Sequence, residues 1–262
     1  MHGLLYEPAP PEGVDGEGSR ADPHHPAAAP RPGRRPLLVW CHGGPTSQAI
    51  VDWSARIRYM TDRGWAVLQP NPRGSTGYGR AYAQALRGRW GELDVADVVA
   101  GIRHAGKAGW CDPRRVAVGG GSAGGFVALL VAAHDPPVVR AVVSAYGVAD
   151  LFRQAETTHR FERRYVDALC GDLPAHARAW RERSPVHRAA EIRVPLLVLQ
   201  GSNDKVVPKE QADLLVGAVR RRGVEVELHV YEGEGHGWSR PATVADDLER
   251  VEAFLARHVL RR

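Results

Sequence analysis

The chain has 262 residues, 44% of them hydrophobic, and a formal net charge of +5 at pH 7. This length is enough for one well-buried α/β domain but not comfortably for two. The charge does not indicate a nucleic-acid partner, because the basic residues are spread among acidic neighbours and the tight runs at 220–222 and 261–262 are typical of solvated helix ends. No apolar run approaches the ~20 residues that cross a bilayer, so we expect no membrane partner.

The N-terminal part of the chain differs in composition from the rest. Residues 1–6 lack the charged start and apolar core of a secretory signal. We expect residues 1–35 to form an N-terminal strand and a flexible linker rich in Pro, Gly and Ala, and residues 36–262 to form one folded domain. The cysteines are odd in number and widely spaced, which indicates reduced thiols and a cytoplasmic protein. They are Cys41, Cys111 and Cys170.

From residue 36 onward, predicted strands and helices alternate. Short apolar or β-branched runs predict strands at 37–41, 66–69, 116–119, 141–144, 196–200 and 225–231. Helical patterns lie near 50–62, 93–105, 126–133, 209–221 and 244–258. Uninterrupted apolar strands are typical of parallel strands buried on both faces. The alternation predicts an α/β fold with a doubly wound, mostly parallel sheet, and a small helical insertion around 150–184 interrupts it.

The most informative segment, residues 115–126, is a glycine cluster that holds one serine. A β-branched run enters it and a helix-forming run leaves it. The pattern Gly120-x-Ser122-x-Gly124 predicts a nucleophile elbow, a tight strand-to-helix turn that exposes a strained serine. Glycines leave room where the strand and helix cross, and the N-terminus of the helix favours a developing anion. Ser122 is therefore the candidate nucleophile.

The same residues also fit a dinucleotide-binding fingerprint, Gly119-x-Gly121-x-x-Gly124. That alternative predicts an acidic residue about 20 residues on, at the end of the next strand. Ser144-Ala-Tyr-Gly occupies this place, and two strand-helix units precede a motif that normally opens its domain. The sequence favours the elbow, whose chemistry requires neither an organic cofactor nor a metal.

An elbow serine needs a base and an acid that orients the base. Asp204 follows the predicted strand 196–200, and His236 lies in a glycine-flanked loop after the strand 225–231. The carboxyl ends of parallel strands meet at one edge of a sheet, where catalytic groups gather. The chain order serine, acid, histidine is that of α/β-hydrolases. We expect Asp204 and His236 to complete the site.

Other roles for these residue types remain open. Asp204 could cap the helix that begins near Pro208. Asp150, after the preceding strand, is a second candidate for the acid. His229 within a strand and His258 near the C-terminus are better explained by packing or solvent exposure.

A second glycine-rich loop supplies candidate oxyanion donors. Trp40-Cys-His42-Gly43-Gly44-Pro45 follows the first strong strand, and its glycines allow the backbone to approach a substrate carbonyl. In α/β-hydrolases one donor comes from such a loop and the other from the residue after the nucleophile. We therefore assign the N–H groups of Gly44 and Ala123.

Five motifs together resemble the prolyl oligopeptidase family of serine peptidases, and the acylaminoacyl-peptidase branch is the closest match. They are His42-Gly-Gly-Pro45, Asn71-Pro-Arg-Gly-Ser-Thr-Gly-Tyr-Gly79, Gly120-Gly-Ser-Ala-Gly-Gly125, Arg183-Ser-Pro185 and Gly233-Glu-Gly-His-Gly237. The resemblance runs from about residue 36 to the C-terminus. It implies a catalytic α/β-hydrolase domain with Ser122, Asp204 and His236 as its triad. It also implies hydrolysis of peptide or acylaminoacyl bonds through an acyl-enzyme.

The chain departs from the family pattern in three ways. Family members usually carry a β-propeller before the hydrolase domain, and we expect none here. The face above Ser122 would then be uncovered, which predicts a homo-oligomer or a cleft open to bulkier substrates. Residues 10–33 are longer than this connection needs, and Val206 stands where the family often has a substrate-binding arginine. The alternatives are a carboxylesterase on the same fold and a non-catalytic remnant that only packs against a partner.

Overall fold

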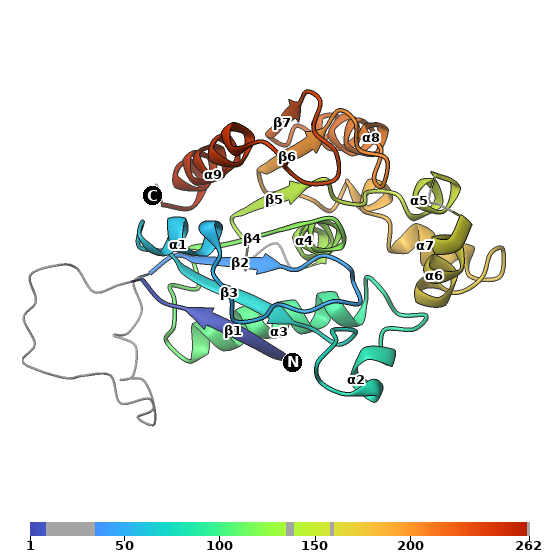
Figure 1. Ribbon diagram of the computed structural model, residues 1–262, viewed down its shortest axis with the longest axis horizontal. Coiled ribbons are helices and arrows are strands. Elements are labelled where there is room, and N and C mark those ends of the chain that lie inside the picture. Colours follow the sequence, from blue (N-terminus) through green and yellow to red (C-terminus); the bar gives the residue numbers. More distant parts are fainter. Residues whose placement is uncertain (9–34, 135–138, 158–159, 261–262) are drawn as a thin grey trace, which may run out of the picture.

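The computed structural model describes residues 1–8, 35–134, 139–157 and 160–260 (Figure 1). The linker expected within residues 10–33 lies outside these ranges. Described residues form one seven-stranded sheet with the order β1-β3-β2-β4-β5-β6-β7. Its strands are β1 (His2–Tyr6), β2 (Leu37–Cys41), β3 (Ala66–Asn71), β4 (Val116–Gly121), β5 (Ala141–Ala145), β6 (Leu196–Gly201) and β7 (Val226–Tyr231).

The sheet is parallel except at one edge. β1 pairs antiparallel with β3, with His2 opposite Asn71, and every other pairing in the sheet is parallel. The prediction of a mostly parallel sheet is thus confirmed. Because neighbouring β4, β5, β6 and β7 run in one direction, the loops after them meet at one edge of the sheet (Figure 1).

Helices cover both faces of the sheet. They are α1 (Ala55–Thr61), α2 (Arg80–Gln84), α3 (Leu93–Lys107), α4 (Ala123–His134), α5 (Leu151–Thr157), α6 (Arg160–Cys170), α7 (Ala177–Glu182), α8 (Lys209–Arg220) and α9 (Pro241–Leu255). One apolar core joins the sheet to α3, α4 and α8, and a second joins it to α1 and α9. Adjacent strand residues alternate between them: Leu37 lies in the first core and Leu38 in the second.

The interruption predicted around 150–184 consists of α5, α6 and α7, which stand together at one end of the molecule (Figure 1). Trp180 is fully buried at the centre of this insertion and stacks at a tilt on Phe152. Its indole N–H donates to the carbonyl oxygen of Gly171 at 2.8 Å. Trp180 belongs to the same apolar core as α3, α4 and α8, so the insertion packs as an extension of the first core.

One predicted helix begins later than expected, and one helix was not predicted. The helix expected near 50–62 begins only at Ala55, because Ser54 acts as its N-cap and accepts from the backbone N–H of Ile57. Ile50, Val51 and Trp53 precede the cap and are exposed. The short helix α2 was not expected.

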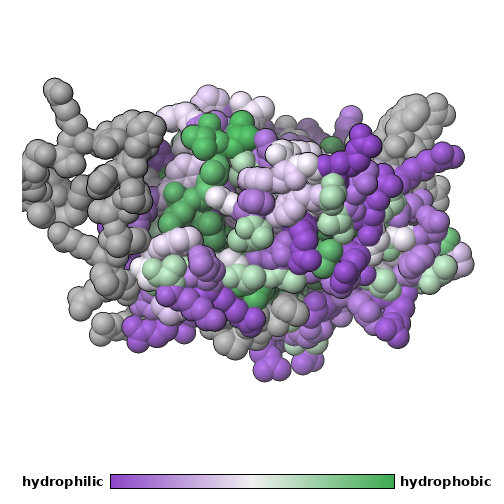
Figure 2. All heavy atoms as spheres, turned by 90° about the horizontal axis from the view of Figure 1, so that it is seen from below, coloured by the Kyte–Doolittle hydropathy of each residue, from purple (hydrophilic) through white to green (hydrophobic). Residues whose placement is uncertain are grey.

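Figure 2 shows that the face seen from below Figure 1 is largely hydrophilic, with a few hydrophobic patches.

The cysteines Cys41, Cys111 and Cys170 are free thiols, and each is buried. None of the helices in the described residues is both long and apolar enough to cross a membrane.

Candidate active site

Ser122 lies at the sharp turn from β4 into α4, as predicted for a nucleophile elbow. Its backbone has a φ of 56°, in the left-handed region that non-glycine residues rarely adopt. The turn is possible only with glycine at two flanking positions. A Cβ on Gly120 would lie 2.6 Å, and one on Gly124 2.2 Å, from the carbonyl oxygen of Cys41 on β2. The strain at Ser122 is therefore imposed by the close crossing of strand and helix.

Ser122, His236 and Asp204 form one hydrogen-bonded chain. His236 Nε2 lies 2.9 Å from Ser122 Oγ, and Nδ1 lies 2.8 Å from Asp204 Oδ2. The carboxylate of Asp204 is fully buried, so the tautomer with Nδ1–H donating to it leaves Nε2 as an acceptor for the serine proton. The structure thus brings the three sequence-predicted side chains together, from the ends of β4, β6 and β7.

The N-cap residue of α8 is Pro208 and no side chain caps it, so Asp204 does not have the capping role that was its alternative interpretation. Its Oδ1 accepts from the backbone N–H groups of Val206 and Val207, at 2.8 and 2.9 Å. Its Oδ2 faces His236, and the amide of Gln200 lies 3.3 Å from the same oxygen. One carboxylate therefore organises its own loop with one oxygen and the imidazole with the other.

A buried carboxylate holds the histidine loop. Glu234 has no exposed surface, and its oxygens accept from Ser239 N–H at 2.9 Å, the Ser239 hydroxyl at 2.7 Å and Arg240 Nε at 2.9 Å. The hydrogen bonds from the Ser239 N–H and hydroxyl hold the pKa of Glu234 well below its usual value. Its carbonyl oxygen accepts from Asn203 N–H at 2.9 Å, which joins the histidine loop to the loop of Asp204.

Tyr146 supports the imidazole from the side. Its ring lies edge-on to His236 at a centroid distance of 4.8 Å, and it contacts Trp238 in the same way at 5.1 Å. Like Ser122, it has a left-handed backbone, with φ of 40°. Glu234 and Tyr146 were not identified from the sequence as members of the site.

The two expected oxyanion donors line the same pocket as Ser122 and His236. Gly44 has a φ of 124°, a conformation that favours glycine, and Ala123 is the first residue of α4. Among the described residues, neither backbone N–H has a hydrogen-bond acceptor. Both groups are therefore available to an oxygen bound beside Ser122.

The pocket has a volume of about 410 Å³ and largely apolar walls. Apart from His236, no ionisable acid or base of the described residues lines it other than the phenol of Tyr165. The side chains that line it away from Ser122 are Trp90, Val148, Gln154, Tyr165, Val166, Val206 and Val207. Gln154, Tyr165 and Val166 come from the insertion, which therefore forms one wall.

Hydrogen bonds join the insertion to the rest of the pocket. Tyr165 Oη accepts from Thr46 N–H at 3.1 Å, beside the loop of Gly44. The amide of Gln154 donates to Val206 O at 3.0 Å and accepts from Gln211 at 2.9 Å. Both glutamines are buried, so this amide pair connects α5 to α8 and to the loop after Asp204.

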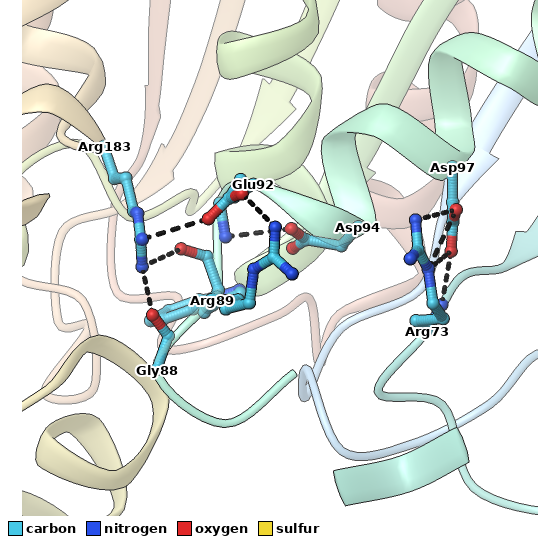
Figure 3. A network of polar contacts seen from close by, with 9 residues as sticks. Arg73, Gly88, Arg89, Glu92, Asp94, Asp97 and Arg183 are labelled. Atoms are coloured by element: carbon cyan, nitrogen blue, oxygen red, sulfur yellow. Dashed lines mark hydrogen bonds and ion pairs between the residues drawn. The ribbon is translucent and has the colours of Figure 1, made fainter. Parts of the chain in front are cut away.

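An arginine from the motif at 183–185 holds the segment that carries Trp90, another residue of the pocket lining. Arg183 donates to Gly88 O at 2.7 Å and pairs with Glu92 at 3.2 Å, which ties the end of α7 to the segment that carries Trp90 (Figure 3). Further along this segment, Asp94 accepts from the N–H of Gly91, and Asp97 forms a bidentate pair with Arg73 (Figure 3).

The other candidate residues lie outside this chain of contacts. Asp150 caps α5 by accepting from Phe152 N–H at 3.0 Å. His229 lies 3.8 Å from Asp246, and His258 packs against Phe254. One group of possible metal ligands is found in the described residues, Glu225, Glu227 and His258. Glu227 is already paired with Arg257, whose fixed positive charge opposes a cation there.

Comparison with known proteins gives consistent relatives. The chain is 32% identical over 227 residues to dipeptidyl aminopeptidase BIII of Pseudoxanthomonas mexicana, covering 85% of this chain and 33% of that protein. It is 31% identical over 231 residues to the acylamino-acid-releasing enzyme of Arabidopsis thaliana, covering 85% and 30%. A solved puromycin-hydrolyzing peptidase of Mycobacterium tuberculosis superposes with a TM-score of 0.89 at 38% identity, covering 98% of this chain and 37% of that one.

The chain thus spans about a third of the length of the curated relatives it matches. Residues 51–261 match the family described as the prolyl oligopeptidase family, Peptidase_S9. This range includes Ser122, Asp204 and His236. The resemblance inferred from the five motifs is confirmed, and this chain belongs to the prolyl oligopeptidase family.

Proposed function

We propose that this chain is a serine peptidase that hydrolyses peptide or acylaminoacyl bonds through an acyl-enzyme on Ser122. The observation that carries the proposal is the hydrogen-bonded chain from Ser122 through His236 to Asp204, at the edge of a pocket with two free N–H donors. The named activities of the relatives, acylamino-acid release, dipeptidyl aminopeptidase and puromycin hydrolysis, support it.

The reaction follows from the roles of these groups. His236 Nε2 takes the proton of Ser122 as Oγ attacks the acyl carbonyl, and Asp204 stabilises the imidazolium. The oxyanion of the tetrahedral intermediate accepts from Gly44 and Ala123 N–H, each worth about 10²–10³ in rate. The imidazolium then protonates the leaving amine. Water, deprotonated by His236, cleaves the acyl-enzyme and restores Ser122, with no metal or organic cofactor.

The pocket indicates the kind of acyl group that binds. An apolar side chain beside the scissile carbonyl would contact Trp90, Val148 and Val207, whereas a charged one would lose its hydration with no partner of opposite charge among the lining residues. We therefore propose substrates with an uncharged, apolar side chain on the acyl residue. Val206 presents a side chain without hydrogen-bonding groups where the family often has an arginine.

Labelling with a fluorophosphonate tests the proposal directly. Stoichiometric labelling of the wild-type protein, lost in Ser122→Ala while thermal unfolding is unchanged, is the expected result. Labelling that persists in this variant would place the nucleophile elsewhere. A wild-type protein that is not labelled would favour the non-catalytic alternative.

A substrate panel then separates peptidase from carboxylesterase. It compares acetylated amino-acid amides and aminoacyl amides of Phe, Leu, Asp and Lys with short-chain esters. We expect cleavage of the Phe and Leu amides and little cleavage of the Asp and Lys amides. Cleavage of esters with no cleavage of any amide would favour the carboxylesterase.

Three further expectations belong to the proposal. We propose that the catalytic domain begins near residue 36, and that the protein is cytoplasmic, as its buried free cysteines suggest. We also propose self-association, which is supported by the exposure of Val51 and Trp53, at 82% and 81%. Light scattering over a range of concentrations tests it, and a strictly monomeric protein would contradict it.

A further inference from the structure

Both ring nitrogens of His42 are engaged, in the loop that carries Gly44. Nδ1 lies 2.7 Å from the carbonyl oxygen of Gly43, and Nε2 lies 2.9 Å from the hydroxyl oxygen of Ser75. Ser75 is only 1% exposed and follows β3, and its own N–H donates to Pro72 O at 3.0 Å. The imidazole thus connects the Gly44 loop to a second, firmly held loop that is distant in sequence.

The acceptor of the Nδ1–H bond lies in the peptide unit that also contains the N–H of Gly44. A trans peptide is planar, so its C=O and N–H point in opposite directions. A hydrogen bond that fixes the direction of Gly43 O therefore also fixes the direction of Gly44 N–H. Glycines on both sides of this peptide leave it little steric restraint of its own, so an external contact has to orient it.

The protonation of His42 is consistent with this contact. Burial lowers its pKa, although the hydrogen bond to Gly43 acts in the opposite direction. The ring is therefore neutral at pH 7, with Nδ1–H donating to Gly43 O and Nε2 accepting from the Ser75 hydroxyl. A single tautomer satisfies both partners.

We propose that His42 is a positioning residue that aims the Gly44 N–H at the oxyanion, with Ser75 holding the ring. The proposal rests on the proposed function, because it assigns the Gly44 N–H to the tetrahedral intermediate. His42 does not touch the substrate in this arrangement. Its effect is confined to one of the two oxyanion donors, and the hydrogen-bonded chain of Ser122, His236 and Asp204 does not include it.

Two substitutions separate the contacts of the ring. The amide of His42→Asn reaches the place of Nδ1 and keeps a donor for Gly43 O, but it loses Ser75. The amide of His42→Gln extends to the place of Nε2 and keeps Ser75, but it loses the donor to Gly43 O. We expect kcat to fall about 10²–10³-fold in His42→Gln, as for loss of one oxyanion donor, and about tenfold in His42→Asn, which loses only the contact with Ser75. KM should change little in either variant.

Binding of a transition-state analogue distinguishes a positioning role of His42 from a merely structural one. A peptide aldehyde, whose adduct carries the oxyanion, should bind His42→Gln weaker by the same factor as kcat falls, while a peptide product should bind both variants as it binds the wild type. His104→Gln, at an exposed histidine that contacts Trp110, is the matched control and should keep wild-type values.

The two possible failures can be distinguished. A wild-type protein without fluorophosphonate labelling would refute the proposed function itself. With labelling intact, equal losses in His42→Asn and His42→Gln, or aldehyde affinity unchanged in His42→Gln, would overturn the positioning role. If His42→Gln does not unfold cooperatively, Ser75→Ala replaces it, because it frees the ring without removing the donor. A loss of about tenfold in kcat is then expected, and an unchanged kcat overturns the proposal.

Discussion

Substitution of Asp94 by asparagine should change how stability depends on pH. Asp94 lies in the first turn of α3 and is 1% exposed. Its Oδ1 accepts from Gly91 N–H at 2.8 Å, while its Oδ2 is buried and has no hydrogen-bond partner among the described residues. Burial raises its pKa from 3.8 to about 7, which favours the protonated carboxyl in the folded protein.

The sign and magnitude follow from proton linkage. Below pH 3.8 the carboxyl is protonated in both states and costs nothing. As pH rises, the unfolded chain releases its proton first, so the folded state loses about 1.4 kcal/mol of stability per pH unit until pH 7. Over about three units the cost reaches about 4 kcal/mol and is then constant. Asparagine can accept from Gly91 in the same way and has no such cost.

Urea unfolding of both proteins between pH 3 and pH 8.5 measures the effect. The free energy of unfolding of Asp94→Asn minus that of the wild type should rise by about 4 kcal/mol from pH 4 to pH 8. Asp112→Asn is the control of opposite sign, because hydrogen bonding to Arg114 lowers the pKa of Asp112. The free energy of unfolding of Asp112→Asn minus that of the wild type should change only at acidic pH, where the wild type loses the contribution of the ion pair. A difference for Asp94→Asn that stays constant from pH 4 to pH 8 would refute the reasoning.

Four other substitutions test the site. Asp204→Asn should lower kcat by up to ~10⁴ because the imidazole tautomer is no longer fixed, and Asp150→Asn much less; the reverse order in steady-state assays would mean that the acid is misassigned. Gly124→Ala should disrupt the elbow, because its Cβ would lie 2.2 Å from Cys41 O. A variant that unfolds at the wild-type temperature and is labelled at the wild-type rate would contradict this. Glu234→Gln should slow fluorophosphonate labelling by at least about tenfold, because an amide NH₂ opposes the backbone donors around it; labelling at the wild-type rate would show that the loop does not need the carboxylate.

The strands and the three central side chains were predictable because their signals are local. A buried parallel strand is an uninterrupted apolar run, and the strand predicted at 196–200 is β6, Leu196–Gly201. The elbow is equally local, since Gly120 and Gly124 are needed wherever a strand and a helix cross this closely. Chain order and the common direction of the strands then suffice to bring Asp204 and His236 to the same edge.

The remaining features depend on contacts that no local pattern encodes. Glu234 resembles a surface glutamate in the sequence, and only the fold of its loop buries it against Ser239 and Arg240. Arg183 donates a hydrogen bond to the carbonyl oxygen of Gly88, which lies 95 positions earlier in the chain. The helix predicted near 50–62 was too long because apolar residues favoured an earlier start, whereas the Ser54 cap set the actual one.

The burial of the three thiols has a practical consequence for enzymology. Burial raises the pKa of Cys111 to about 11 and of Cys170 to about 12, and it raises that of Cys41 further. Because the thiolate is the form that alkylating reagents attack, these cysteines should be inert to iodoacetamide in the folded protein. Alkylation can therefore be used to silence contaminating cysteine peptidases in a preparation of this protein. The hydrolysis that survives the treatment does not come from those cysteine peptidases.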